Sequence, residues 1–372
     1  MIFCLCLPVY AEEMPVEIKA KSVVLMDETT GKVLLKENEN EKLYPASVTK
    51  IMSMLLVMEA LDGNKIRLTD TVAATPTAAS KGGSQIWLKE GEQMTVDELL
   101  KATAVYSAND ACTLLGEYVA GSDEAFVEMM NTRASELGMK NTHFDNCTGL
   151  DDESTTHLTT AYDIALMSRE LMKHSLIREY TTIWMDSLRE GKTELVNTNK
   201  LIRFYDGATG LKTGTTSKAG CCISATATRG GTSMIAVVMG ADNSTDRFET
   251  AKSLLNWGFA NYSTVTPTVD KKLITDVNVL TGEERVIKPQ IVNVPSLLVK
   301  KGRETDIKQK FELTTAVEAP VESNQTLGRV VFTLDGERIG ECSLTAPHYV
   351  EKLTLHAVFA RMLGALCKKS ER

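Results

Sequence analysis

The sequence predicts an α+β fold in which one antiparallel sheet packs against a cluster of helices. Three alternating apolar segments support the sheet: a hairpin over residues 22–36 and two strands over residues 220–228 and 234–239. Between the hairpin and these strands, apolar residues recur every three or four positions, which is the spacing of helices. The sheet should therefore join the beginning of this region to its end, with the helices packed on it.

The other elements of this region follow from local patterns. Residues 51–61 have apolar side chains at helical spacing, so one face of this helix should pack inward. Thr95 and Glu98 form a capping-box pattern at the start of another helix, and residues 206–215 approach a further strand. Additional helices are predicted over residues 111–120, 126–137, 160–171 and 247–259.

The composition divides the chain into four segments. Residues 1–11 form an apolar run with small residues at the positions of a cleavage site, which predicts a signal peptide remnant and export; a disordered tail is the alternative. Residues 12–263 form the main α+β domain, and turn-bounded alternating segments predict a small β-rich domain over residues 264–345. Residues 346–372 predict a basic amphipathic helix at the membrane surface, or one packed on the β-rich domain.

Charge and cysteine usage exclude several classes of protein. The net charge of -8 and the lack of long basic runs argue against nucleic acid as a partner. No apolar run approaches the roughly 18 residues that a membrane-spanning helix needs. The cysteines after residue 11 show no zinc-ligand spacing, so we expect no metal site and mostly core positions, although an oxidising compartment could pair some of them. They are Cys112, Cys147, Cys221, Cys222, Cys342 and Cys367.

Ser47 and Lys50 lie three residues apart where the first predicted helix begins. This spacing places both side chains on one face of the helical turn. A hydroxyl beside an amine at a helix N-terminus is a candidate nucleophile, because the amine can take the proton and free backbone N–H groups favour developing negative charge. Alone the pair is weak evidence, since a capping serine followed by a solvated lysine would give the same pattern.

A second lysine, in Lys212-Thr213-Gly214, receives a different predicted role. Burial and repulsion from Lys212 should both lower the pKa of Lys50, so that Lys50 can accept the proton of Ser47. We expect Lys212 to be more exposed in the cleft, to stay charged and to bind a carboxylate of the substrate.

The remaining candidate residues would assist acyl transfer. Ser107 could relay a proton to the leaving amine, while Asn109 positions the lysine and the substrate amide. Gly214 would let its strand approach the bound peptide. The backbone N–H groups of Ser47 and Thr215 would form an oxyanion hole, in which one donor is worth roughly 3 to 4 kcal/mol.

Three motifs occur in this order along the chain: Ser47-x-x-Lys50, Ser107-Ala-Asn109 and Lys212-Thr213-Gly214. Together they are the signature of β-lactamases and penicillin-binding proteins. The segments over residues 46–52, 83–88, 107–111, 149–152 with His157, and 210–220 with Asp206 resemble the D-alanyl-D-alanine carboxypeptidases, the low-molecular-mass penicillin-binding proteins. The resemblance covers nearly the whole chain and implies a transpeptidase-like catalytic domain. It also implies removal of the terminal D-alanine from peptidoglycan stem pentapeptides through a serine acyl-enzyme, covalent inhibition by β-lactam antibiotics, and no metal or organic cofactor.

The resemblance also assigns roles to individual residues. The implied catalytic residues are Ser47, Lys50 and Ser107, and the implied substrate-binding residues are Asn109, Lys212, Thr213, Gly214 and Thr215. His157 matches a family position, where we expect a structural role. One departure is Thr198, which stands where some relatives carry an arginine that would help to hold the carboxylate.

Two other functions compete with this interpretation. A class A β-lactamase would share the three motifs, but the Glu-x-x-Leu-Asn loop of that family is missing between Asn109 and Lys212, and the β-rich domain would be surplus. A non-catalytic peptidoglycan-binding protein would share the fold, but the intact set of motif residues argues against it.

Overall fold

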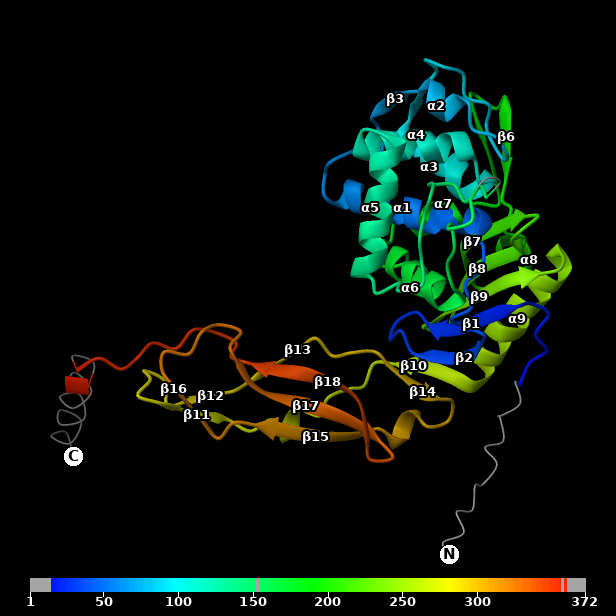
Figure 1. Ribbon diagram of the computed structural model, residues 1–372. Helices are drawn as coiled ribbons and strands as arrows, with labels where there is room; N and C mark the ends of the chain where they lie inside the picture. Colours follow the sequence, from blue (N-terminus) through cyan, green and yellow to red (C-terminus); the bar gives the residue numbers. More distant parts are fainter. Residues whose placement is uncertain (1–14, 152–153, 356–357, 360–372) are drawn as a thin grey trace, which may run out of the picture. The chain divides into compact units, whose positions relative to one another are not determined.

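The computed structural model describes residues 15–151, 154–355, 358 and 359, and the chain divides into two compact units between Asn261 and Tyr262 (Figure 1). The first unit contains a five-stranded sheet made of β1 (Ser22–Asp27), β2 (Val33–Glu37), β7 (Ala208–Thr216), β8 (Gly220–Arg229) and β9 (Thr232–Ala241). Its strand order is β2-β1-β9-β8-β7, and every pair is antiparallel. The α+β prediction is confirmed, including the pairing of the first hairpin with a strand from the end of the unit.

Helices lie on both sides of this sheet, some on its faces and others packed on those helices. They are α1 (Lys50–Asp62), α2 (Pro76–Ala79), α3 (Val96–Lys101), α4 (Asn109–Ala120), α5 (Asp123–Glu136), α6 (Ala161–Leu171), α7 (Ile177–Thr181), α8 (Leu201–Phe204) and α9 (Ser244–Asn261). Alternate residues of β1 separate the two layers: Val24 and Met26 join the core shared with the helical cluster, whereas Leu25 faces Gly258 of α9. In Figure 1 the cluster around α1, α4 and α5 lies above the sheet.

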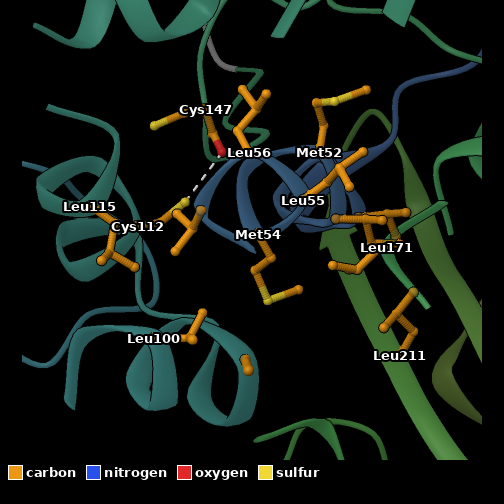
Figure 2. Packing of buried hydrophobic residues seen from close by; sticks show 14 of the residues in the cluster. Met52, Met54, Leu55, Leu56, Leu100, Cys112, Leu115, Cys147, Leu171 and Leu211 are labelled. Atoms are coloured by element: carbon orange, nitrogen blue, oxygen red, sulfur yellow. Dashed lines mark hydrogen bonds between the residues drawn. The ribbon is translucent and has the colours of Figure 1, made fainter. Parts of the chain in front are cut away.

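The first helix is more deeply buried than its periodicity predicts. Every residue of α1 from Lys50 to Met58 is at most 5 % exposed, so the expectation of a single inward face is wrong. Met54 and Leu56 point to opposite sides of the helix, and both meet apolar neighbours (Figure 2). The helix lies in the middle of the unit, where neighbouring helices surround it, and a helix that is apolar all round is typical of such a position.

Four short strands and several short helices were not predicted. The strands are β3 (Thr71–Ala73), which pairs with β4 (Gln93–Thr95), and β5 (Met185–Leu188), which pairs with β6 (Thr193–Val196). Each is only three or four residues long, so neither alternation nor helical spacing can accumulate a signal. The capping box of Thr95 and Glu98 at the start of α3 is confirmed.

Up to Thr354, the second unit consists of strands, loops and short 3₁₀ turns. Its strands are β10 (Tyr262–Val265), β11 (Val277–Leu280), β12 (Val286–Ile287), β13 (Gln290–Val292), β14 (Leu297–Lys300), β15 (Lys308–Leu313), β16 (Ala316–Glu318), β17 (Thr326–Leu334) and β18 (Glu337–Thr345). They form sheets of the orders β13-β18-β17-β15, β12-β11-β16 and β10-β14. Two small apolar cores lie under these sheets, one around Phe332 and one around Val321.

The terminal segment begins differently from the prediction of a helix over residues 346–372. Val350 pairs with Val321 and Lys352 pairs with Gly282, so this stretch is tied to the second unit as extended chain. Helical geometry begins at Leu355 among the described residues. Most of the predicted helix, together with the predicted signal remnant over residues 1–11, lies outside the described residues. Within the described part, no helix combines the length and apolarity needed to cross a membrane.

Candidate active site

Ser47 and Lys50 meet at the start of α1. Ser47 lies in a 3₁₀ turn, Ala46–Thr49, that runs directly into the helix. Lys50 Nζ lies 3.0 Å from Ser47 Oγ. Ala46, just before the serine, has a φ of 48° although it carries a Cβ, a backbone conformation that costs energy and is concentrated at functional sites. The structure thus holds this hydroxyl and amine together in a fixed geometry.

Lys50 is completely buried and has three hydrogen-bond partners. Its Nζ contacts Ser47 Oγ, Asn109 Oδ1 at 2.5 Å and the backbone carbonyl of Thr148 at 2.9 Å. Burial lowers the pKa of Lys50 to about 8, because the interior solvates the ammonium form poorly. This pKa leaves a substantial neutral fraction near neutral pH, which a proton acceptor requires.

Asn109 links Lys50 to a neighbouring loop. It is the first residue of α4, and its Nδ2 donates to Gly82 O at 2.7 Å, while its backbone N–H donates to Ser84 O at 2.6 Å. The Nδ2 contact fixes the orientation of the amide, so that Oδ1 faces Lys50. Sequence analysis predicted that Asn109 positions the lysine, and the structure brings the two side chains into contact.

Ser107 lies between a π-helical turn, Ala102–Tyr106, and α4. Its φ of 67° is left-handed, which again is unusual for a residue with a Cβ. Among the described residues, Ser107 Oγ has no hydrogen-bond partner, so the hydroxyl is available to a substrate. Its role as a proton relay stays a prediction.

Thr148 was missed by sequence analysis. It acts through its backbone carbonyl, which belongs to a turn that Asn146 Oδ1 stabilises by accepting the N–H groups of Thr148 and Gly149. Gly149 has a φ of 86°, and a Cβ there would lie 1.8 Å from Ala46 O, so only glycine fits. The turn cluster is visible in the sequence, but a backbone carbonyl has no residue type that could reveal its function.

The strand β7 forms the other wall of the site. It is one of the two edge strands of the sheet, and a Cβ at Gly214 would lie 2.8 Å from Ser47 N and from Pro45 O. The backbone of the Lys212-Thr213-Gly214 motif therefore passes directly against the nucleophile candidate. Thr213 Oγ1 donates to Thr198 Oγ1 at 2.7 Å. Thr198, which stands where some relatives carry an arginine, thus orients the hydroxyl of Thr213.

Lys212 is buried, and the prediction that it is more exposed is wrong. Only 1 % of its surface is accessible, and among the described residues its Nζ has one hydrogen-bond acceptor, the Thr213 carbonyl at 2.8 Å. Burial, followed by repulsion from Lys50, lowers the pKa of Lys212 well below its usual value. An ammonium with three donors and one acceptor has room for an anionic ligand.

Arg247 is a third buried cation that sequence analysis did not identify. It lies on α9, and its Nη1 donates to Gly214 O at 3.2 Å and to Thr215 Oγ1 at 3.1 Å. These contacts fix the peptide group between Gly214 and Thr215, whose N–H is the predicted second donor of the oxyanion hole. Its position within a regular helix gave no sign of this contact, because the strand it binds is more than 30 residues earlier.

His157 has the structural role that was expected. It is fully buried, its Nδ1 accepts the backbone N–H of Asp145 at 3.0 Å, and its Nε2 lies 2.8 Å from Thr49 Oγ1. Burial lowers its pKa to about 4, so the ring is neutral at physiological pH. Within the described residues, no group of three or more His, Cys, Asp or Glu side chains is arranged to hold a metal ion.

Comparisons with known proteins agree with this geometry. Residues 9–243 match a family model described as D-alanyl-D-alanine carboxypeptidase, and residues 262–352 match one described as the C-terminal domain of penicillin-binding protein 5. The chain is 42 % identical over 350 residues to the D-alanyl-D-alanine carboxypeptidase DacF of Bacillus subtilis, covering 93 % of this chain and 90 % of the relative.

Solved structures give the same result. The chain is similar to penicillin-binding protein 5 from Haemophilus influenzae, with a TM-score of 0.77 and 31 % identity over 91 % of this chain and 99 % of that one. It is also similar to penicillin-binding protein D2 from Listeria monocytogenes in its ampicillin-bound form, with a TM-score of 0.59 and 31 % identity over 65 % of this chain and 98 % of that one.

Proposed function

This chain belongs to the D-alanyl-D-alanine carboxypeptidase family, and we propose that its reaction proceeds through an acyl-enzyme on Ser47. The protein is a serine hydrolase of peptidoglycan that binds penicillin. The observation that carries the residue assignment is the contact between Ser47 Oγ and the buried Lys50 Nζ. The substrate is a stem pentapeptide ending in D-Ala-D-Ala, from which the terminal D-alanine is released.

The hydrogen bonds of Lys50 direct its lone pair to the serine. A neutral amine has two N–H donors and one lone pair. The oxygens of Asn109 and Thr148 can only accept, so they take the two N–H groups. The hydroxyl of Ser47 can donate as well as accept, so it occupies the remaining direction as donor to the lone pair. As Ser47 Oγ attacks the peptide carbonyl, its proton passes to Lys50.

Lys212 binds the carboxylate end of the substrate, and Arg247 supports the oxyanion hole. Two donors of a charged Lys212 have no acceptor among the described residues, and the terminal carboxylate of the peptide would supply one. The arriving negative charge raises the pKa of Lys212, so the lysine gains its proton when the substrate binds. Arg247 holds the Gly214 carbonyl, and this supports an oxyanion hole made of the N–H groups of Ser47 and Thr215.

Departure of D-alanine completes acylation. Its amine must gain a proton as the bond to the carbonyl breaks, and Ser107 carries this proton from Lys50. The acyl group stays on Ser47 until water hydrolyses the ester. In a β-lactam the leaving amine remains tethered to the acyl group, which accounts for a persistent adduct.

Labelling with a fluorescent penicillin tests the assignment. The wild type should form a persistent adduct that Ser47→Ala abolishes, with both proteins showing the same thermal unfolding. Rapid turnover of the penicillin by the wild type would instead indicate a β-lactamase. The absence of any label on the wild type would indicate a non-catalytic peptidoglycan-binding protein.

We infer further that the enzyme is exported and attaches peripherally to the outer face of the membrane through its C-terminal segment. Leu355 and Phe359, at the start of that segment, are 90 % and 64 % exposed, and the sequence beyond them is basic and amphipathic. A truncation after Thr354 keeps the strand pairings of Val350 and Lys352 intact. Loss of binding to anionic vesicles with unchanged penicillin labelling would support the anchor, and unchanged vesicle binding would refute it.

A further inference from the structure

Trp87 is an unusual residue beside the active site. Its side chain is 73 % exposed, and its φ of 61° lies in the left-handed region. A bulky residue rarely adopts this conformation, because its Cβ clashes with the backbone. Strain of this kind persists only where the surrounding structure enforces it, and it is concentrated at functional sites. Neither the exposure nor the strain contributes to the acyl-transfer site described above.

The strain is enforced by a buried carboxylate next to the catalytic motif. The N–H groups of Ile86 and Leu88 donate to the two oxygens of Asp110 at 3.1 and 3.0 Å, so the peptide groups flanking Trp87 are fixed. Asp110 is fully buried and follows Asn109 directly, which holds the same loop through Ser84 O. The loop that presents Trp87 is therefore fastened to the start of α4, where Asn109 also contacts Lys50.

Trp87 lines an open hollow of about 760 Å³ on this surface. The other lining residues include both hydrogen-bond donors and acceptors, among them Lys89, Glu90, Lys192 and Thr193. Arg189 stiffens the rim, since it donates to Ile86 O at 2.9 Å and to Glu92 at 2.6 Å. The hollow thus combines one rigid aromatic face with polar groups of both signs.

We propose that this hollow binds the glycan strand of peptidoglycan, with a sugar ring stacked on the indole of Trp87. A pyranose ring has an apolar C–H face, which suits an aromatic surface, and a polar edge of hydroxyl and N-acetyl groups, which needs both donors and acceptors. The proposal rests on the proposed function, because the stem peptide that enters the cleft is covalently attached to the glycan. Holding the sugar next to the cleft raises the effective concentration of the peptide at Ser47.

Binding of a sugar without any peptide tests the site independently of catalysis. The probe is the tetramer of β-1,4-linked N-acetylglucosamine, titrated calorimetrically into the full chain. The wild type should bind it, Trp87→Ala should weaken binding roughly five- to tenfold, and Trp87→Phe should retain most of it. The expected loss corresponds to about 1.0 to 1.4 kcal/mol, which is within the range of aromatic stacking. Phe204→Ala is the matched control, because Phe204 is another aromatic that is 63 % exposed, and it should bind like the wild type.

A stability measurement separates the binding role from a structural one. Glycine adopts positive φ without strain, so Trp87→Gly should unfold at the same or a higher temperature than the wild type while losing sugar binding to the same extent as Trp87→Ala. No detectable binding by the wild type, or equal binding by wild type and Trp87→Ala, would overturn the glycan site.

Turnover separates this proposal from the proposed function. The ratio of kcat/KM for a disaccharide-linked pentapeptide to kcat/KM for the sugar-free pentapeptide should fall roughly five- to tenfold in Trp87→Ala. An unchanged ratio with equal losses on both substrates would mean that the hollow holds peptide, and would overturn the glycan assignment. Sugar binding by a wild type that hydrolyses neither substrate would contradict the proposed function while supporting the glycan site.

Discussion

The two walls of the cleft carry one buried lysine each, but the lysines have different surroundings. On the helical wall, Lys50 has three hydrogen-bond partners, one of which is the hydroxyl of Ser47. On the strand wall, Lys212 is equally buried and has one partner, a backbone carbonyl. The two lysines are therefore buried to the same depth, but the hydrogen-bonding capacity of the amine is filled by the protein at Lys50 and largely unfilled at Lys212.

This difference explains how two neighbouring lysines can do different work. An amine whose contacts are all supplied by the protein is held in one geometry, which suits a base that must act on a single hydroxyl. An amine with free donors in a buried place is unfavourable until a ligand arrives, which suits a binding group for a carboxylate. The number of internal acceptors, rather than exposure, distinguishes the base from the binding group.

Removing the base should have the largest effect. Lys50→Met keeps the volume and eliminates the amine, so the second-order rate of acylation by penicillin should fall about 10³-fold. The same variant leaves the oxygens of Asn109 and Thr148 without their amine partner, so its thermal unfolding is measured to show that the protein stays folded. Acylation within tenfold of the wild-type rate would show that Lys50 is not the base.

Replacing the lysine of the strand wall by methionine should affect some substrates more than others. Lys212→Met should lower kcat/KM roughly 10- to 100-fold for peptides with a free terminal carboxylate, the worth of a hydrogen bond to a charged group. Peptides amidated at the C-terminus should lose much less. Equal losses on the two kinds of peptide would remove the distinction between the walls.

The pH dependence of the acylation rate should reflect the pKa of Lys50 on the helical wall. The neutral form of an amine is populated above its pKa, and burial lowers the pKa of Lys50 to about 8. The acylation rate for an uncharged ester substrate should therefore rise about tenfold per pH unit below 8 and level off above it. A rate that continued to rise in the same way up to pH 10 would contradict the lowered pKa.

Arg247 offers a smaller test behind the strand wall. Its guanidinium supports the Gly214 carbonyl without reaching the substrate, so Arg247→Met should lower kcat about three- to tenfold and leave KM nearly unchanged. Arg247→Lys should restore part of the loss. A change confined to KM would indicate that Arg247 instead contributes to substrate binding.

Sequence analysis predicted which residues form the two walls, but it did not predict how deeply Lys212 is buried. The sheet could be predicted because the alternation of its strands and their order along the chain are visible in the sequence. The pairing of hydroxyl and amine follows from the Ser47-x-x-Lys50 spacing, which is visible there too. The burial of Lys212 depends on how β7 packs against Pro45 and Ser47, which no local pattern encodes.

Other parts of the site were hidden for related reasons. Thr148 contributes a backbone carbonyl, which every residue type possesses, and Arg247 reaches the site from a helix that gives no other sign of function. The left-handed backbone of Trp87 is imposed by Asp110, more than 20 residues later, and no propensity of tryptophan would suggest it.

The most direct test of the account is the pKa of the Lys50 amine, measured by NMR on protein with ¹³C-labelled lysine. The Lys50 resonance is assigned by its absence in Lys50→Met. A midpoint near 8 is the expected result, because it would give a neutral amine beside Ser47 in a substantial fraction of molecules. A midpoint near the ordinary 10.5 would mean that Lys50 is an ammonium at physiological pH, and the proposal that it takes the proton of Ser47 would be contradicted.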